Sequence, residues 1–503
     1  MLSSTVAAAR LPLIAICGTT GVGKSNLAIE LALELARRAA SSGSPWVGAR
    51  IINADAMQCY AGMDVITNKV SDAEMKGVEH LLMGHKQPGE QYVVGQWVQD
   101  ATKAIEETHR RHQIPIVVGG TSYWIQHLLF PNRLAQPEPP AYPTAAPMSD
   151  AMQKSVDGLS SELRSLYDSI PEHPPSASDD PTSAFALHSL LNALDPLVAA
   201  RWHWRDTRKV LRNLQIMKET GRLPSEIMST QSNQVIEPRY RTLLYWLYAH
   251  PDALNPRLDA RVDSMIKSGL LHEIRALQAI AASASTTTQS DPDYTLGIYQ
   301  SIGYKEFHDY LTATDPPARL FEEAVERMKL STRQYAKRQI SWIRNKLLPL
   351  VNHPSEEPVA HAYLFNATEL GTAWHSHVLQ PALQITTDFL AGNALPDPQS
   401  LSDAAKQMLV ITQKPVDPHA VLEARRKVVC SICTLDPAQP CMIEEGAQWA
   451  AHERTKVHRR LASKSQREAA VKAAQESKRK ARSDQASTNR SNEEVAVADL
   501  FLP

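Results

Sequence analysis

A run of residues near the N-terminus, GTTGVGKS from Gly18 to Ser25, has the residue types and spacing needed to bind phosphate. It matches the pattern G-x-x-x-x-G-K-[ST] at every fixed position, directly after a short apolar stretch. The glycines Gly18, Gly21 and Gly23 let main-chain N–H groups wrap around phosphate oxygens, and the helix that follows adds partial positive charge. Lys24 adds a full positive charge, and the Ser25 hydroxyl is placed to hold Mg²⁺. The sequence therefore predicts a site for a di- or triphosphate.

The loop by itself fits a kinase, a GTPase or an ATPase. A GTPase should also carry the pattern N-K-x-D, which binds guanine, but Asn68-Lys69 is followed by Val70 and Ser71. This weakens the GTPase interpretation and leaves the phosphate ligand open.

Asp55 follows a second apolar stretch, Arg50 to Asn53, that is typical of a strand. The carboxyl ends of parallel strands form the edge of a sheet where ligands bind, so Asp55 and Lys24 are expected to face one cleft. There Asp55 could act as a general base or as a magnesium ligand. It could equally be a helix N-cap, a position where Asp is favoured. Position alone does not decide between these roles.

Side chains of the kind that bind zinc lie late in the chain: Cys430, Cys433, His452 and His458. The Cys-x-x-Cys pair and the spacing of the two histidines fall within the range of zinc fingers, although the gap between the pairs is longer than usual. If one helix from about Glu445 carried both histidines, they would be rotated apart by about 240° beyond a full turn. The helix must therefore loosen or end between them. Cys441 is a rival ligand, and a tail without metal is the remaining alternative.

Alternating strands and helices must position these residues. Apolar stretches typical of strands span residues 11–17, 50–53 and 114–118, and helical patterns span 26–40 and 95–112. Strands that alternate with helices indicate a parallel sheet with helices on both faces. The predicted fold class is α/β, with a P-loop NTPase-like parallel sheet core, a mostly helical insertion domain and a small C-terminal C2H2 zinc finger.

Changes in composition indicate where these parts begin and end. A proline-rich stretch at 131–147 opens the insertion, and a polar, charged segment follows the Cys/His cluster. The predicted parts are the first part of the core (1–133), a mostly helical insertion (134–235), the completion of the core with a long basic helix (236–350), a linker or extension (351–425), the finger (426–462) and a charged tail predicted to be disordered (463–503).

Composition excludes some classes of function. The 503-residue chain is 43% apolar and 21% charged, which is ordinary for a soluble globular protein, and it has no run of 18 apolar residues, so no membrane partner is expected. A net charge of −1 means that nucleic-acid binding must come from local basic segments, such as 201–212 and 327–346, which could instead be solvated helix faces. The five cysteines do not form a disulfide framework, which favours a reducing compartment. The first ten residues, MLSSTVAAAR, faintly resemble a mitochondrial transit peptide; the alternative is a frayed terminus.

Several longer motifs occur in a fixed order along the chain. After the phosphate loop they are NADAMQCYAGMDVITNK (53–69), EQYVVGQW (90–97), VVGGTSY (117–123), residues 203–212, GRLPSE (221–226), residues 257–265, SIGYKEF (301–307) and TRQYAKRQISW (332–342). This ordered set, over about residues 11–348 together with the Cys/His cluster, resembles the tRNA isopentenyl (dimethylallyl) transferase family in its eukaryotic form. Two positions depart from the family's pattern: Arg205 stands where Asn is common, and Glu79 stands where a second His is common before His80.

The resemblance implies that the loop cradles the diphosphate of dimethylallyl diphosphate rather than ATP. Asp55 then matches the family's general base, Thr20 a loop threonine that hydrogen-bonds the diphosphate, and Arg261 an arginine that clamps it, and all three are implied to take part in catalysis. The implied tRNA-binding residues are Asp55, Gln58, Thr67, Thr121, Arg208, Arg212, Gln334 and Arg338. The implied cofactors are Mg²⁺ at Ser25 and a structural Zn²⁺ at the Cys/His cluster.

The implied reaction moves the dimethylallyl group to the exocyclic amine (N6) of the adenosine 3′ of the anticodon, in a tRNA anticodon stem-loop. The expected protein is a cytoplasmic monomer, with a mitochondrial or nuclear share left open. Two other functions remain as alternatives. A P-loop nucleotide or small-molecule kinase would bind ATP and need no finger, whereas a non-enzymatic RNA-binding zinc-finger protein would need no Asp55 beside Lys24.

Overall fold

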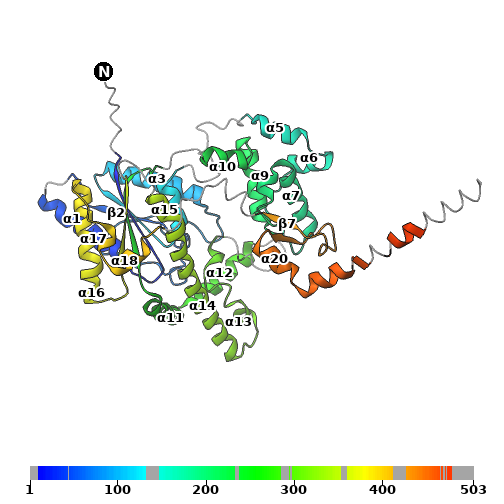
Figure 1. Cartoon of the computed structure of the whole chain (residues 1–503). Helices are drawn as coiled ribbons and strands as arrows, with labels where there is room; N and C mark the ends of the chain where they lie inside the picture. The colour runs from blue at the N-terminus through cyan, green and yellow to red at the C-terminus, as the bar shows by residue number, and fades with distance from the viewer. Residues whose placement is uncertain are drawn as a thin grey trace, which may run out of the picture. The chain divides into compact units, whose positions relative to one another are not determined.

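A computed structural model gives the fold of the chain. The structure describes residues 10–42, 45–131, 147–232, 237–284, 294, 297–352, 359–411, 426–464, 466–467, 471 and 473–478. The candidate transit segment, apart from Arg10, and most of the predicted tail lie outside the described residues. The chain divides into two compact units (Figure 1). Unit 1 takes the described residues of 1–136 and 234–416, and unit 2 takes those of 137–233 and 417–503.

A parallel sheet of six strands forms the centre of unit 1, in the order β3-β2-β4-β1-β5-β6. Its strands are β1 (Pro12–Gly18), β2 (Ala49–Asn53), β3 (His80–Leu81), β4 (Ile114–Val118), β5 (Arg241–Tyr248) and β6 (Ala360–Asn366). Ile14 of β1 lies opposite Ile116 on one side and Leu243 on the other. The three predicted strands are confirmed, and the predicted α/β class with a parallel sheet is confirmed with them. The strands β1, β2 and β4 are apolar and almost wholly buried because helices cover both faces of the sheet.

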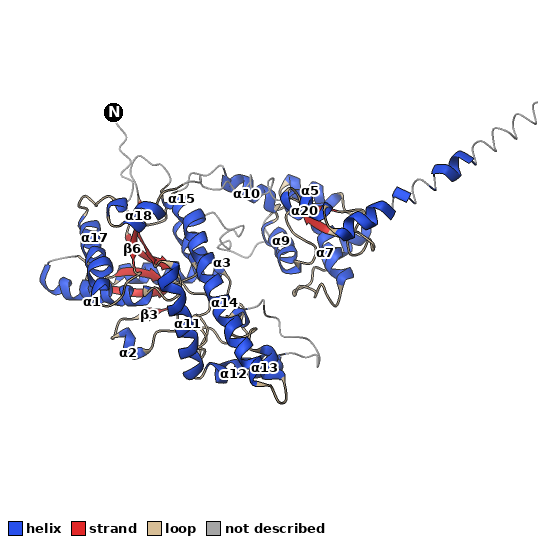
Figure 2. Cartoon of the chain, turned by 60° about the horizontal axis from the view of Figure 1, so that its bottom comes forward, coloured by secondary structure: helices blue, strands red, loops and turns tan. Residues whose placement is uncertain are grey.

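Helices lie on both faces of the sheet (Figure 2). Alternate residues of its strands pack against opposite layers of helices. Leu13, Ala15 and Cys17 pack against one layer, whereas Ile14 and Ile16 pack against the other. The first layer contains α3 (Val94–Arg110), α4 (Ser122–Leu129), α15 (Leu348–Val351) and α18 (Asp403–Met408), and the second contains α1 (Lys24–Ser42), α11 (Pro251–Lys267), α16 (Thr372–Trp374) and α17 (Gln380–Ala391).

A further cluster of helices extends unit 1 beyond the sheet. Its apolar core joins residues just after β2, such as Tyr60 and Ile66, to α12 (Leu270–Ala284), η1 (Gly297–Gln300), α13 (His308–Thr312) and α14 (Ala318–Trp342). The predicted long basic helix is α14, which continues through the π-helical turn η2 (Ile343–Leu347) into α15. The short α2 (Asp72–Met75) is closed by a capping box between Ser71 and Glu74. Among the described residues, none of the helices combines the length and the apolar character needed to cross a membrane.

Unit 2 combines a bundle of helices with a small β-hairpin. The helices are α5 (Asp150–Asp157), α6 (Ser161–Asp168), α7 (Pro181–Leu194), α8 (Pro196–Ala199), α9 (Thr207–Thr220) and α10 (Pro224–Ser232), and they share one apolar core. The hairpin, β7 (Lys427–Val429) with β8 (Met442–Glu444), is followed by α20 (Ala447–Glu453). The Trp204 indole N–H donates to the Pro440 carbonyl at 2.8 Å, and Met442 packs on Trp204. The hairpin region and the helical insertion therefore form one compact unit, whereas the sequence predicted the insertion (134–235) and the finger (426–462) as separate parts.

Candidate active site and metal centre

The phosphate loop joins the end of β1 to the start of α1. Gly18 has a φ of +145°, and a Cβ there would lie 2.3 Å from the Leu247 carbonyl oxygen of the neighbouring strand β5. Gly23 has a φ of +90° just before Lys24 opens the helix. Only glycine adopts both conformations at low cost, so the backbone turns sharply and presents the N-terminus of α1 at the edge of the sheet.

Lys24 is a half-buried cation, and no acidic side chain among the described residues lies within ion-pair distance of its ammonium. Its Nζ donates to the Thr19 carbonyl at 2.7 Å, within its own loop. Burial lowers the pKa of Lys24 to about 8; the negative charge of Asp55 opposes this shift, and the positive charge of Arg261 adds to it. A bound anion would restore the charged form, because it returns the solvation that burial removes.

Arg261 adds a second cation to the same place. It lies on α11, and its Nη1 donates to the Thr20 hydroxyl at 3.0 Å. Burial lowers the pKa of the Arg261 guanidinium from its ordinary value, while Asp55 opposes this. Two predicted diphosphate residues separated by 241 positions in the chain are thus in direct contact.

The two carboxylate oxygens of Asp55 have different surroundings: one is hydrogen-bonded to the main chain and the other faces the site. Its Oδ1 accepts the main-chain N–H of Met57 at 3.0 Å, which closes a turn; no helix begins at this point, so the N-cap interpretation of Asp55 is wrong. Its Oδ2 lies beside the glycines after β4, 3.1 Å from where a Cβ of Gly120 would be. Oδ2 accepts no hydrogen bond from the described residues. One oxygen thus fixes the side chain and leaves the other able to accept a proton.

Gln339 joins the loops that follow β1 and β4, and the sequence did not single it out. Its Oε1 accepts the Thr20 N–H at 2.9 Å, and its Nε2 donates to the Gly120 carbonyl at 2.9 Å. Tyr335, one turn earlier on α14, lies in the same pocket, and burial followed by the charge of Asp55 raises the pKa of its phenol above the ordinary range. Both residues belong to the motif TRQYAKRQISW, but local spacing did not separate Gln339, which is buried, from its exposed neighbours.

Thr121, Gln58 and Thr67 hold the chain that follows Asp55. The Thr121 hydroxyl accepts the Ala56 N–H at 3.0 Å. The Gln58 amide donates to the carbonyls of Thr67 and Asn68 at 3.1 and 3.0 Å. These side chains shape the wall of the site beside Asp55.

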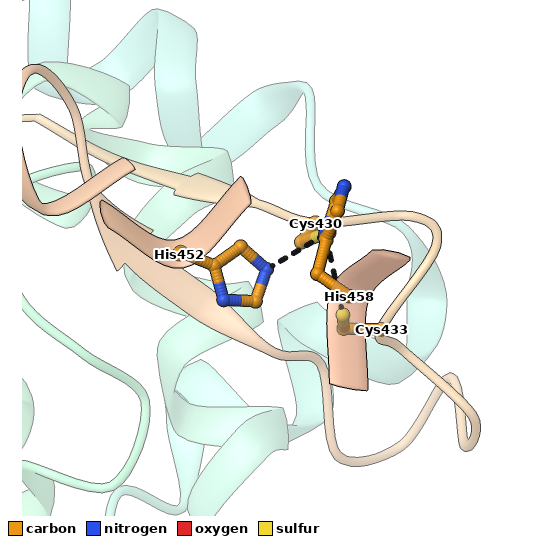
Figure 3. Close-up of side chains that lie close together, drawn as sticks. All are labelled: Cys430, Cys433, His452 and His458. Carbon is orange, nitrogen blue, oxygen red and sulfur yellow. Dashed lines mark hydrogen bonds between the residues drawn. The ribbon is translucent and has the colours of Figure 1, made fainter. Parts of the chain in front are cut away.

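Four metal-binding side chains converge in unit 2 (Figure 3): Cys430, Cys433, His452 and His458. Their ligand atoms all lie within 4.8 Å of one another. The His458 ring nitrogen Nδ1 is 3.5 Å from each sulfur and 3.1 Å from His452 Nε2. This is the predicted set of four, and it forms a Cys2His2-type site.

The helix between the two histidines ends, as their spacing predicted. α20 stops at Glu453, a turn covers Arg454 and Thr455, and a second helical segment begins at residue 456. The break lets both rings face the sulfurs. Cys441 is not among the converging side chains; its main chain closes the hairpin instead, because its carbonyl accepts the Cys430 N–H at 2.8 Å.

Comparison with known proteins gives the family. The model of the family described as IPP transferase matches residues 58–346. The chain belongs to this family. It is 35% identical over 458 residues to the tRNA dimethylallyltransferase of Schizosaccharomyces pombe, covering 89% of this chain and 94% of that protein. It is 32% identical over 464 residues to the tRNA dimethylallyltransferase of Homo sapiens, covering 89% and 85%. A solved structure of a eukaryotic dimethylallyltransferase acting on tRNA matches with a TM-score of 0.67 and 30% identity, covering 92% of this chain and 100% of that one.

Two departures from the common IPP transferase pattern have partners in the structure. Glu79 accepts a hydrogen bond from Arg50 Nε at 2.8 Å, and Arg50 is only 4% exposed. The Arg205 guanidinium lies 4.9 Å from the ring centre of Trp204, the residue on which the hairpin packs. Both side chains therefore make local contacts.

The predicted tRNA-binding cations of this IPP transferase lie in both units. Arg208, which is exposed, and Arg212 are on α9 in unit 2, and the Arg212 guanidinium donates to Glu219 at 2.9 and 3.1 Å. Gln334 and Arg338 are exposed on α14 in unit 1, beside the half-buried Tyr335 and the buried Gln339. Helix α14 therefore presents polar side chains outward and holds the phosphate loop inward.

Proposed function

We propose that the chain transfers the dimethylallyl group from dimethylallyl diphosphate to N6 of the adenosine 3′ of the tRNA anticodon, as a monomer, and releases diphosphate. The observation that carries this proposal is the meeting of Lys24, Arg261 and the open oxygen of Asp55 around one phosphate loop. The names of the relatives in the same family support the reaction and its tRNA acceptor.

The residue types suit the two demands of this reaction. Breaking the allylic C–O bond builds negative charge on the departing diphosphate, and Lys24, Arg261 and the N–H groups of the loop would stabilise that charge as it develops. Because Thr20 binds Arg261 through its hydroxyl and Gln339 through its N–H, it would keep the loop and the arginine in register.

The acceptor amine needs a base, because its lone pair is delocalised into the adenine ring. Asp55 Oδ2 would take the amine proton as the new C–N bond forms, while Oδ1 stays bound to the main chain. The target base must leave its stack to reach this carboxylate, as enzymes that modify bases require.

Two metal ions fit the residues present. The Ser25 hydroxyl, in the first turn of α1 beside Lys24, would hold Mg²⁺, which would neutralise charge on the diphosphate. The two thiols and two imidazoles in unit 2 are the donor set of a closed structural zinc site. Because all five cysteines are free thiols, we place the protein in a reducing compartment, the cytoplasm, and leave a mitochondrial or nuclear share open.

Incubation with labelled dimethylallyl diphosphate and unmodified tRNA tests the proposal. We expect label on wild-type tRNA, none on a tRNA whose adenosine 3′ of the anticodon is replaced by guanosine, and no dependence on ATP. Consumption of ATP without prenyl transfer would support the kinase alternative. Tight binding of tRNA without transfer would support the binding-protein alternative.

A further inference from the structure

Residues 366–374, directly after the edge strand β6, reach the back of the phosphate loop. Trp374, at the end of α16, is 9% exposed, and its ring lies against the loop: a Cβ on Gly23 would come within 2.7 and 2.9 Å of two ring carbons. The indole N–H donates to Glu30 Oε2 at 2.9 Å, on the helix that continues from the loop. Trp374 therefore fixes both the last glycine of the loop and the helix behind it.

The same segment also holds the helix that carries Arg261. Arg257 Nη1 donates to the Ala367 carbonyl at 3.1 Å, and Nη2 donates to the Thr368 carbonyl. The Thr368 hydroxyl accepts the N–H of His250, the N-cap residue of α11, at 2.9 Å. Because Arg257 precedes Arg261 by about one helical turn, these bonds fix the direction in which Arg261 is presented.

The phosphate loop and helix α11, which this segment holds, are the two walls of the diphosphate site. They touch each other through the Arg261–Thr20 bond and through Leu258, whose side chain lies 2.9 Å from where a Cβ of Gly21 would be. Neither contact involves covalent linkage between loop and helix, so their spacing depends on what lies behind them. A displacement of about 1 Å at such a site can cost on the order of 10²-fold in rate.

We propose that residues 366–374 form a brace that sets the spacing between the phosphate loop and Arg261, with Trp374 and Arg257 as its positioning residues. The brace rests on the proposed function only in that the site it shapes takes a diphosphate. It gives a role to part of the segment between the basic helix and the finger, for which the sequence offered none.

The test measures diphosphate binding by the full-length chain, with inorganic diphosphate and Mg²⁺ as the probe. Trp374→Ala should raise the Kd for diphosphate by about tenfold and lower kcat/KM for dimethylallyl diphosphate by at least as much, while the Kd for tRNA changes little. Trp374→Phe should recover most of the affinity, because a smaller ring still packs on Gly23. Arg257→Gln should act in the same direction if the alanine variant fails to fold.

Phe389→Ala is the matched control. Phe389 is buried in the same layer of helices. It is not among the residues near Gly23, and it does not accept the hydrogen bonds of Arg257. Its loss should lower the melting temperature without raising the Kd for diphosphate. Wild-type diphosphate affinity in both Trp374→Ala and Arg257→Gln, or an equal loss of tRNA affinity, would overturn the brace. A wild-type chain that binds diphosphate but transfers no prenyl group would refute the proposed function and leave this binding test intact.

Discussion

The phosphate loop of unit 1, together with Asp55 and Arg261, forms what we call the crevice. It and the Cys/His site of unit 2 take their residues from the chain in different ways. The crevice draws Thr20, Asp55 and Arg261 from distant parts of the chain, and a buried sheet with two layers of helices holds them in place. The Cys/His site draws its ligands from one short segment of the chain. That segment consists of a hairpin, whose two strands have three residues each, and two short helical segments. We therefore expect the crevice to keep its form without a ligand, whereas the finger should need a bound metal to stay closed.

The two sites also favour ligands of opposite charge. The crevice gathers cations, and burial lowers the pKa of Lys24 to about 8, although the negative charge of Asp55 opposes this shift. The finger gathers thiols and imidazoles, and burial together with Cys430 raises the pKa of Cys433 to about 11. One site is prepared for an anion and the other for a cation. The two should fail separately when each is damaged, and the predictions that follow test that separation.

The largest expected effect is on chemistry at Asp55. Asp55→Ala should lower single-turnover transfer by about 10²- to 10⁴-fold, since the general base is lost. Zinc content should stay at the wild-type value because unit 2 is untouched, and the Kd for tRNA should change little because the cations on α9 and α14 remain. Quenched-flow transfer at saturating substrates measures the first, and metal analysis the second. Unchanged transfer would remove Asp55 from the mechanism.

Loss of Arg261 should come next. Arg261→Ala should lower kcat/KM for dimethylallyl diphosphate by about 10²- to 10³-fold, the usual cost of removing one donor that stabilises developing charge. Arg333→Ala is a control from α14, because its guanidinium pairs with Asp259 on the same helix as Arg261 rather than with the loop. A similar loss in both variants would mean that the position of α11, not the Arg261 charge, matters.

Loss of the metal from the finger should leave the crevice working. Cys430→Ser should remove zinc, and Cys441→Ser should keep it, because the Cys441 side chain lies outside the converging set. The zinc-free chain should bind tRNA on the order of tenfold more weakly, with transfer at saturating tRNA nearly unchanged. Zinc that survives in the first variant and is lost in the second would contradict this ligand set.

The parts that the sequence predicted are those governed by local rules. The glycines and Lys24 of the loop, the strand before it and the end of the helix between His452 and His458 each follow from residues within a few positions of one another. Gln339 is bonded to Thr20 across 319 positions, and Trp374 reaches Glu30 across 344. The pairing of Trp204 with Pro440 spans 236. Such contacts carry no short-range periodicity, so only the fold reveals them.

The depressed pKa of Lys24 predicts a pH dependence confined to the crevice. In the free protein Lys24 loses its proton as pH rises through about 8, and a bound anion favours the protonated form. The Kd for an unreactive thio-analogue of dimethylallyl diphosphate should therefore rise by up to about tenfold per pH unit above that point. Lys24→Arg should flatten this rise, because guanidinium stays charged. A flat wild-type profile between pH 7 and 9.5 would show that the loop does not depend on this charge.

The smallest expected effect separates cations that contact RNA phosphate from cations that belong to solvated helix faces. Each lysine or arginine that contacts a phosphate releases counterions, so its loss should lower the slope of log K against log salt by about one unit or slightly less. Arg208→Gln on α9 and Arg338→Gln on α14 should each show this change in tRNA binding, measured across a series of salt concentrations. Arg212→Gln should show a smaller change, because Glu219 already pairs with the Arg212 guanidinium in the free protein. Arg319→Gln, an exposed residue paired with Glu323 at the far end of α14, serves as the control that leaves the slope unchanged. If Arg208→Gln also leaves the slope unchanged, that side chain belongs to a solvated helix face and makes no phosphate contact.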